Sequence, residues 1–248
     1  MSETVRYLIL SDIHANIDAL DAVLAAAANE WDRVLVLGDL VGYGAEPNAV
    51  IDRVLELDPL AVIRGNHDKA ACGLDSGENF NQTARYAATW TLEQLTPANR
   101  EYLWQLPAGP TAIDDRLEIC HGAPFDEDHY IFDAVDALRA LEAAQRPVCI
   151  FGHTHLPVIF SADGTQLMAE VPDEEMSTLS LQSGLRYLIN PGSVGQPRDG
   201  DPRAAFGFYR SDGVMLFRRV EYNVGEAQRR ISAAGLPQSL ANRLAIGR

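Results

Sequence analysis

Five of the six histidines in this sequence lie in short polar clusters that follow runs of apolar residues. The sixth, His129, lies in an acidic loop outside the clusters and is expected to be a solvated surface residue. Imidazole, carboxylate and amide groups together are the ligands of borderline or hard divalent cations such as Mn, Fe(II), Zn and Ni. The clusters therefore indicate metal-dependent chemistry. They are Ser11-Asp12-Ile13-His14, Gly38-Asp39, Arg64-Gly65-Asn66-His67-Asp68, Cys120-His121-Gly122 and Gly152-His153-Thr154-His155.

The clusters contain more side chains of ligand type than one tetrahedral ion needs, so a centre of two metal ions with open positions is the simplest interpretation. The pairs Asp12/His14 and His153/His155 are each two residues apart, and both members can face a metal only where the backbone is extended or turning. The candidate ligands are Asp12, His14, Asp39, Asn66, His121, His153 and His155.

The apolar runs that precede the clusters are predicted strands, and helical patterns alternate with them. This alternation favours parallel strands joined by crossover helices. Because the carboxyl ends of parallel strands form the ligand-binding rim of such a sheet, we expect the clusters to converge on one edge. The predicted strands are 5–10, 33–37, 60–63, 116–120 and 148–151, and the predicted helices are 17–28, 47–57, 79–95, 97–104 and 132–144.

The remainder of the chain has short apolar runs separated by turn residues, which predict a second, largely antiparallel sheet. The acid-rich stretch 162–184 is expected to be a surface excursion, and no linker divides residues 1–248, so we expect a single domain. The predicted strands here are 158–160, 166–169, 186–189, 205–209 and 214–217, followed by helices at 225–234 and 238–246.

The chain carries 20 basic and 35 acidic side chains among 248 residues, a formal net charge of −15. Such a surface repels phosphodiester backbones and anionic membranes, so we expect neither a nucleic-acid coat protein nor a membrane binder. A phosphorylated substrate must then meet a local positive centre. With no apolar stretch of about 20 residues and an acidic beginning, the chain is expected to be soluble and cytoplasmic. The three cysteines form no C-x-x-C pair, which disfavours disulfides and cysteine-ligated zinc.

The ordered series D-x-H, G-D, G-N-H-D, H and G-H-x-H, from Asp12 to His155, resembles the motif series of the calcineurin-like metallophosphoesterases. The stretch 190–198 further resembles the bacterial phosphodiesterase subgroup with diadenosine-tetraphosphatase-like members. This resemblance implies an α/β fold, namely a four-layer α/β/β/α sandwich of two mixed sheets, with a dinuclear site at the edge between the sheets.

The resemblance also implies the role of each cluster residue. The first ion would be bound by Asp12, His14 and His155, and the second by Asn66, His121 and His153. The carboxylate of Asp39 would bridge them. The catalytic residue His67 would lie just outside the metals, positioned by a neighbouring acidic group, for which Asp68 is a candidate.

Elementary electrostatics supports a hydrolytic mechanism at such a centre. Two divalent ions and two aspartates leave a net positive charge that attracts phosphate. A water shared by ions about 3.5–4 Å apart has a pKa near 7 and can attack phosphorus in line with the leaving oxygen. As an imidazolium, His67 would give that oxygen a proton. The ligand types favour Mn, Fe, Zn or Ni and suit Mg less well.

The sequence also limits the substrate. Protein serine/threonine phosphatases and dinucleoside-tetraphosphate hydrolases carry an arginine after the Gly-Asp block, whereas residues 38–44 contain none. Three further side chains have open roles. The guanidinium of Arg64 either touches a phosphate or pairs with a surface carboxylate. The ring of Tyr43 either stacks on a base or packs over Pro47. The side chain of Arg198 either swings over the site or belongs to a rigid turn.

The leading hypothesis is a metal-dependent phosphoesterase acting on a small phosphodiester or nucleotide. The second is hydrolysis of a phosphoanhydride such as a dinucleoside polyphosphate. The third is a non-catalytic interaction scaffold on the same fold, which the retention of all seven ligand positions and His67 disfavours. The physiological substrate, the native metals and the oligomeric state are not determined by the sequence.

Overall fold

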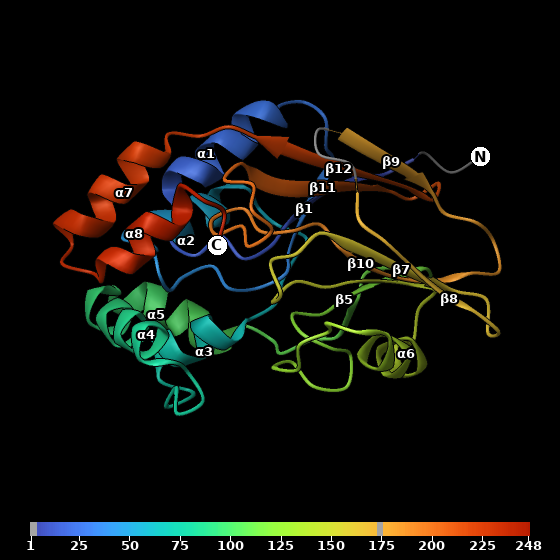
Figure 1. Ribbon diagram of the computed structural model, residues 1–248, viewed down its shortest axis with the longest axis horizontal. Helices are drawn as coiled ribbons and strands as arrows, with labels where there is room; N and C mark the ends of the chain where they lie inside the picture. The colour runs from blue at the N-terminus through green and yellow to red at the C-terminus, as the bar shows by residue number, and fades with distance from the viewer. Residues whose placement is uncertain (1–3, 173–175) are drawn as a thin grey trace.

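Two six-stranded sheets pack face to face in the computed structural model, which describes residues 4–172 and 176–248 (Figure 1). In spatial order the first sheet contains β3 (Ala61–Val62), β2 (Arg33–Val36), β1 (Arg6–Leu10), β11 (Ala204–Arg210), β12 (Val214–Val220) and β9 (Met176–Ser180). The second contains β4 (Thr111–Ala112), β5 (Leu117–Ile119), β6 (Val148–Ile150), β10 (Arg186–Asn190), β7 (Val158–Ala162) and β8 (Leu167–Glu170).

Each sheet is mixed. In the first, β1, β2 and β3 are parallel, whereas β11, β12 and β9 continue beyond β1 as antiparallel neighbours. In the second, β5, β6 and β10 are parallel, and β4, β7 and β8 are antiparallel to their neighbours. The predicted division into an earlier parallel sheet and a later antiparallel one is therefore wrong. An apolar run predicts that a segment is a strand. The strand with which it pairs, as Ile9 pairs with Gly207 across some 200 residues, depends on the tertiary structure.

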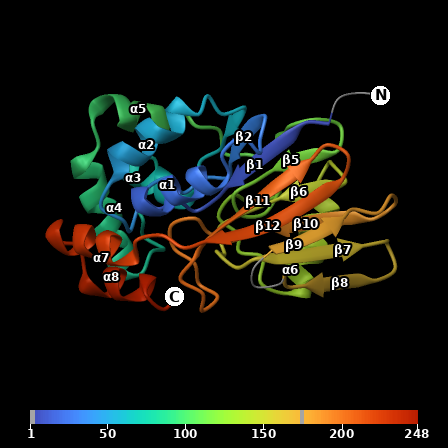
Figure 2. The same cartoon turned by 90° about the horizontal axis from the view of Figure 1, so that it is seen from above.

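The layers follow from the alternation of side chains along each strand. In β1, Ile9 faces the core between the sheets, where it meets Ile119 and Ile150 of the second sheet. Its neighbours Leu8 and Leu10 face the opposite side, which α1 (Ile17–Ala26) and α2 (Pro47–Glu56) cover. A third core lies between the second sheet and α6 (Ala134–Ala143). The expected four-layer α/β/β/α sandwich is confirmed (Figure 2).

Five more helices gather at one end of the sandwich (Figure 2). A fourth apolar cluster joins Ala84 and Ala87 of α4 to Ile231 of α7 and to Leu240 and Leu244 of α8. The helices are α3 (Asn66–Cys72), α4 (Gln82–Gln94), α5 (Pro97–Gln105), α7 (Val224–Ala233) and α8 (Gln238–Leu244). The C-terminal part of the chain is thereby brought beside the segment that follows the third polar cluster.

Helix α3 was not expected, because its seven residues are mostly polar and too few to give a helical period. It begins inside the polar cluster itself, where Asp68 Oδ2 accepts a hydrogen bond from the main-chain N–H of Gly65 at 3.0 Å and caps the helix. As a result Asn66 and His67 lie in the first turn of a helix rather than in a loop. The other seven helices lie within a few residues of their predicted bounds.

The acid-rich stretch 162–184 is more ordered than a surface excursion. It contains β8, and it also contains β9, which pairs with β12 and so carries the chain from the second sheet back to the first. Residues 173–175 lie outside the described part of the chain. Across the described residues, none of the helices is both long and apolar enough to span a bilayer.

Candidate metal centre

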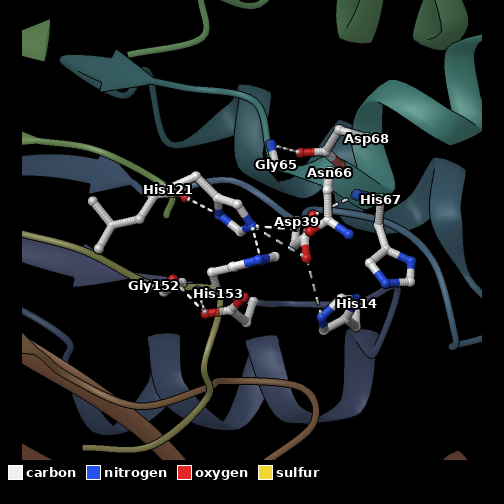
Figure 3. A network of polar contacts seen from close by, with 12 residues as sticks. His14, Asp39, Gly65, Asn66, His67, Asp68, His121, Gly152 and His153 are labelled. Atoms are coloured by element: carbon white, nitrogen blue, oxygen red, sulfur yellow. Dashed lines mark hydrogen bonds and ion pairs between the residues drawn. The ribbon is translucent and has the colours of Figure 1, made fainter. Parts of the chain in front are cut away.

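Polar side chains from both sheets meet where the carboxyl ends of their parallel strands lie together (Figure 3). Asp12 and His14 follow β1, and Asp39 follows β2. His121 follows β5, whereas His153 and His155 follow β6; Asn66 and His67 open α3. All of these except Asn66 are buried, with at most 4% of the residue surface exposed. The expected convergence is confirmed, although the residues come from two facing sheets rather than one edge.

The backbone turns sharply at most of these positions. Positive φ angles of 50–67° occur at Asp12, His14, Asp39, His153 and His155. For residues other than glycine this left-handed conformation costs about 1–2 kcal/mol each, so it persists only where other contacts enforce it. One such contact is the hydrogen bond from the main-chain N–H of His14 to Asp39 O at 2.9 Å. The close spacing of the two pairs is thus accommodated by turning backbone.

Two glycines let these turns approach one another. A Cβ on Gly65 would lie 2.1 Å from Asp39 Oδ1, and one on Gly152 would lie 2.1 Å from Ser11 Oγ. Real Cβ atoms do not come this close to other atoms, so only glycine fits at either position. The carboxylates of the first and second polar clusters, Asp12 and Asp39, therefore depend on glycines of other clusters for their positions.

Each of four buried histidines places its outer ring nitrogen against a main-chain oxygen. Since a carbonyl oxygen can only accept, that nitrogen carries a proton, and the inner nitrogen is the one left to bind a metal. This is the arrangement in which proteins present histidine to a metal. The four contacts are His14 Nδ1 to Val41 O (3.1 Å), His121 Nδ1 to Leu37 O (2.7 Å), His155 Nδ1 to Gln196 O (2.6 Å) and His153 Nε2 to Asp128 O (3.1 Å).

The inner nitrogens face each other in two pairs. The distance from His14 Nε2 to His155 Nε2 is 3.1 Å, and the distance from His153 Nδ1 to His121 Nε2 is also 3.1 Å. Two facing lone pairs repel unless a cation or a proton lies between them. Asp39 Oδ2 lies between the two pairs, 3.5 Å from His14 Nε2 and 3.5 Å from His121 Nε2.

The donors therefore form two groups that share Asp39. In one, donor atoms of Asp12, His14, Asp39 and His155 all lie within 4.8 Å of one another, and in the other the same holds for Asp39, His121 and His153. The side chain of Asn66 joins the second group, because its Oδ1 is 3.3 Å from His121 Nε2. Nitrogen and oxygen donors at this spacing fit divalent cations.

The charges of the protein alone show how strongly this place attracts positive charge. Burial would lower the pKa of His121, but the carboxylates of Asp39 and Asp12 raise it to about 10. Burial raises the pKa of Asp12 to about 6. Burial also opposes ionisation of Asp39, yet the neighbouring imidazoles of His121 and His67 hold its pKa well below the usual range. A cation among these groups is therefore stabilised by both carboxylates.

The predicted catalytic residue lies beside the donors and is held by aromatic rings. The ring of His67 lies 4.3 Å from the ring of Tyr43 and 4.6 Å from that of Phe80, with His14 edge-on at 5.0 Å. Burial lowers the pKa of His67 to about 4, despite the nearby Asp39 carboxylate. Burial among the rings therefore favours the neutral imidazole in the protein alone, whereas the expectation from the sequence is an imidazolium during catalysis.

The candidate orienting carboxylate, Asp68, does not contact the His67 ring. Asp68 accepts hydrogen bonds from the main-chain N–H groups of Gly65 (3.0 Å) and Val41 (3.1 Å), and Figure 3 shows it directed away from the His67 ring. Nδ1 of His67 is buried and has no hydrogen-bond partner among the described residues. Position and orientation of this ring come from packing, not from an acidic partner.

Of the two roles left open for Arg64, pairing with a carboxylate is the one observed. Its Nε and Nη2 donate to the two carboxylate oxygens of Glu127 at 3.0 and 2.9 Å. The ammonium of Lys69 contacts Glu127 at 3.1 Å and Asp128 at 2.6 Å. This bidentate pairing occupies the guanidinium that would otherwise meet a phosphate.

The two other candidate substrate contacts are Tyr43 and Arg198, each of which had two possible roles. Tyr43 is 7% exposed and packs on His67 and His14, with ring centres 4.3 and 4.8 Å away, so it is a wall of the site and not a free platform. The segment before Arg198 is a rigid turn, since the main-chain N–H of Gly195 donates to Asp12 O at 3.0 Å. The guanidinium of Arg198 nevertheless reaches the site, 5.8 Å from the centre of the Tyr43 ring.

Several neighbours of the site gave no sequence signal. Tyr130 stacks on the ring of His153 with centres 3.7 Å apart, and Arg243 lies 5.7 Å from the centre of the Tyr43 ring. Neither belongs to a motif. The prediction that His129 is a solvated surface residue is also corrected. Its side chain is half-buried, and its Nε2 lies 2.9 Å from Oδ1 of Asp136, a residue of α6 that packs against the loop.

Comparison with known proteins agrees over nearly the whole chain. A family model, the calcineurin-like phosphoesterase superfamily domain, matches residues 5–211. A metallophosphoesterase of Sphaerobacter thermophilus is 40% identical, and its crystal structure matches with a TM-score of 0.89 over 99% of this chain and 100% of that one. The uncharacterized protein MJ0912 of Methanocaldococcus jannaschii is 34% identical over 250 residues, 97% of each chain. The phosphodiesterase YfcE of Escherichia coli is 26% identical over 224 residues, 86% of this chain and 91% of YfcE.

Proposed function

This chain belongs to the calcineurin-like phosphoesterase superfamily, and on that premise we propose that it is a dinuclear-metal-dependent phosphoesterase acting on a small phosphodiester or nucleotide. One observation carries the proposal. Four buried histidines turn bare nitrogens inward, in two facing pairs, and the carboxylate of Asp39 lies 3.5 Å from a member of each pair. A shared carboxylate between two nitrogen-rich groups is what two adjacent cations require.

The ligands divide between the two groups. One ion is assigned to Asp12, His14 and His155, the other to Asn66, His121 and His153, and Asp39 is shared. Divalent ions supply Lewis acidity, which activates water and stabilises charge on phosphate oxygens. The donor types favour Mn, Fe, Zn or Ni over Mg. The outer hydrogen bonds to main-chain oxygens fix each imidazole in its ligating orientation.

We assign His67 to the leaving oxygen, as a neutral imidazole that donates a hydrogen bond. The rings of Tyr43 and Phe80 hold it beside the donors without an acidic partner. A neutral donor stabilises an alkoxide more than it stabilises a nitrophenolate, which needs little help to depart. His67→Ala is therefore expected to slow hydrolysis of alkyl esters more than that of nitrophenyl esters, and equal losses would count against this role.

The preference for diesters rests on two observations. The relative YfcE is named a phosphodiesterase. In addition, residues 38–44 lack the arginine with which the protein phosphatases of this superfamily grip a monoester. A small substrate is proposed as the partner, with no nucleic-acid or membrane surface, and a cytoplasmic location stays a prediction. The interaction-scaffold alternative is disfavoured because every donor is retained and directed inward.

The test compares hydrolysis of bis-p-nitrophenyl phosphate with that of p-nitrophenyl phosphate. Chelated protein is assayed with and without added Mn²⁺, and bound metal is counted by elemental analysis. We expect turnover of the diester that requires metal, two metal equivalents per chain, and loss of both in His153→Ala. His129→Ala, which changes a histidine outside the centre, is the matched control and is expected to keep activity and metal.

Three results would contradict the proposal. A single metal equivalent in fully active protein would overturn the dinuclear centre. Faster hydrolysis of the monoester would overturn the diester preference. Two bound metals with no turnover of any phosphate ester would favour anhydride substrates first and the scaffold second.

A further inference from the structure

Three aromatic rings form a stack that leads from the candidate metal centre to the surface. The ring of Tyr130 lies against that of His153, with centres 3.7 Å apart and planes 23° from parallel. The ring of Phe132 stacks on Tyr130, with centres 5.1 Å apart and planes only 5° from parallel. The exposed fraction rises along the stack, from 3% at His153 to 38% at Tyr130 and 61% at Phe132. Because His153 is a donor of the centre, the stack begins at the centre and ends in solvent.

The outer two rings of the stack present uncovered aromatic surface. Single exposed apolar side chains are ordinary in proteins, but parallel rings next to a buried site form a surface on which another flat ring can stack. Phe125 of the same loop is also exposed, yet its face is in contact, because the guanidinium carbon of Arg139 lies 4.4 Å from the ring centre. Tyr130 and Phe132 are therefore the pair of rings that a ligand can reach.

The segment that carries both rings is held at its two ends. Before it, Asp128 forms an ion pair with Lys69 at 2.6 Å, and its main-chain oxygen lies 3.1 Å from His153 Nε2. After it, the carboxylate of Asp133 accepts the N–H of Asp136 at 3.0 Å and caps α6. An aromatic side chain has few torsions to order. Stacking of a ligand on rings in such a fixed segment therefore costs little conformational entropy.

The other ring that could stack on a base is already enclosed. Tyr43 is 7% exposed and lies against the rings of His67 and His14. The stack lies instead beside the other donor group, at His153. Since His67 is assigned to the leaving oxygen, a group that binds on the His153 side is the one that stays on phosphorus.

We propose that Tyr130 and Phe132 form an aromatic platform that binds the base of a nucleoside phosphodiester whose phosphate lies at the metal centre. The proposal rests on the proposed function, because it takes the phosphate to be held by the metals. In a nucleoside ester one sugar separates the base from the phosphate, and in the stack one ring, that of Tyr130, separates Phe132 from a donor of the centre. The substrate class is then a phosphodiester whose retained group is a nucleoside, and not a diester of glycerol or another aliphatic alcohol.

The first experiment compares two diesters that differ only in the retained group. The p-nitrophenyl ester of thymidine monophosphate and methyl p-nitrophenyl phosphate have the same charge and release the same p-nitrophenolate. With Mn²⁺-loaded enzyme we expect kcat/KM to favour the nucleoside ester. Phe132→Ala is expected to lower the ratio of the two kcat/KM values about tenfold, because base–aromatic stacking is lost, and Tyr130→Leu should act in the same direction. Phe132→Tyr keeps a ring and should retain the wild-type ratio. Thermal unfolding verifies that the variants are folded.

The matched control is Trp104→Ala. The side chain of Trp104 is aromatic and 49% exposed, belongs to α5, and lines a separate cavity with Leu95 and Pro97. The substitution removes exposed aromatic surface that is not part of the platform, so the ratio should change by less than about twofold. Equal losses in Trp104→Ala and Phe132→Ala would overturn the platform.

A second experiment measures recognition of the base in the absence of the diester bond. Adenosine monophosphate and ribose 5-phosphate are titrated into Mn²⁺-loaded protein by calorimetry, because they share the sugar and the phosphate and differ by the base. We expect adenosine monophosphate to bind about tenfold more tightly, and we expect Phe132→Ala to remove most of this difference. Equal affinity of the two compounds for the wild type would overturn the platform.

The outcomes separate the platform from the proposed function. If neither diester is hydrolysed but the difference in affinity depends on Phe132, the proposed function fails and the platform stands. If both diesters are hydrolysed and Phe132→Ala keeps the wild-type ratio, the platform is overturned and the function stands. Sedimentation tests another occupant of exposed rings, a second copy of this chain. A dimer that dissociates in Phe132→Ala, with an unchanged ratio, would overturn the platform as well.

Discussion

Two groups of cationic side chains flank the candidate metal centre, and their charges are balanced differently. We call the group beside His121 and His153 the closed flank, which consists of Arg64, Lys69, Glu127 and Asp128. We call the group beside His14 and His67 the open flank, which consists of Tyr43, Arg198 and Arg243. The closed flank has two cations and two carboxylates in contact, whereas the open flank has two cations around a phenol ring.

The difference indicates what each flank does. A cation bound by its own carboxylates gains little from a substrate, since the substrate would have to displace them. The ion pairs of Lys69 with Glu127 and Asp128 instead stabilise the loop that carries Asp128. The main-chain oxygen of Asp128 accepts a hydrogen bond from the ring N–H of His153 at 3.1 Å. A cation without a carboxylate can gain from an anionic ligand. We therefore expect the closed flank to affect stability and the open flank to affect substrate affinity.

The largest effect is expected from Asp39, the residue that the two donor groups between the flanks share. Asp39→Asn removes the charge shared by the two donor groups, so both should lose metal. Changes to residues that merely support ligands cost 10–100-fold in activity, so loss of a shared ligand is expected to cost about 10³-fold or more. Turnover of bis-p-nitrophenyl phosphate and elemental analysis measure this. Asp136→Asn, at a carboxylate paired with the non-ligating His129, is the control, and retained metal in Asp39→Asn would refute a shared carboxylate.

The closed flank can be broken at Glu127. The Glu127→Gln change leaves the partly buried guanidinium of Arg64 without its paired carboxylate, and we expect a loss of about 2 kcal/mol in the free energy of unfolding. KM for bis-p-nitrophenyl phosphate should stay within about twofold, because the substrate does not contact this flank. Urea denaturation and steady-state kinetics measure the two quantities. Glu56→Gln, whose side chain is 66% exposed and pairs with Arg53, should cost under about 0.5 kcal/mol. A changed KM with an unchanged free energy of unfolding would contradict the expectation that the closed flank affects stability and not substrate affinity.

Salt sharpens the comparison on the open flank. The Debye length falls from about 10 Å at 0.1 M ionic strength to about 3 Å at 1 M. KM for bis-p-nitrophenyl phosphate, which carries one negative charge, is therefore expected to rise about twofold over this range in the wild type and less in Arg198→Gln. Arg229→Gln, which removes an arginine of α7 that is 69% exposed, should keep the wild-type salt dependence. Parallel salt dependence in the wild type and Arg198→Gln would mean that Arg198 does not meet the substrate.

The smallest effect is a pH dependence of the closed flank. Burial would raise the pKa of Glu127, but hydrogen bonds from Arg64 and Lys69 hold it below its usual value of 4.5. Because the folded-state pKa is depressed, these contacts stabilise the fold above pH 4.5 and lose that contribution as the pH falls below it. The difference in unfolding free energy between wild type and Glu127→Gln should therefore shrink on acidification. Denaturation of chelated protein from pH 7 down to about pH 3, well below the usual pKa of Glu127, measures it, and a difference that stays constant over this range would disprove the linkage.

Much of the site was predictable because its chemistry is encoded in residue types at strand ends. The clusters from Asp12 to His155 indicate nitrogen and oxygen ligands, and the apolar runs before them predict the strands that position these ligands. The helices from 17 onward were predictable for the same reason, except α3, which is too short and too polar to show a period. What failed were statements that needed a neighbour, such as the expected partner of His67 and the exposure of His129.

The sequence by itself therefore determined the donor set, its order along the chain and the alternation of strands and helices. These are local properties of residue type and spacing. Only the tertiary structure decided which sheet each strand joins, that the His67 ring lies against those of Tyr43 and Phe80, and that Arg64 pairs with Glu127 whereas Arg198 and Arg243 lie near the Tyr43 ring. Each of these features depends on contacts between segments that are tens to hundreds of residues apart in the sequence. The protonation state and the hydrogen-bond partners of a buried group are set by the groups that surround it in space.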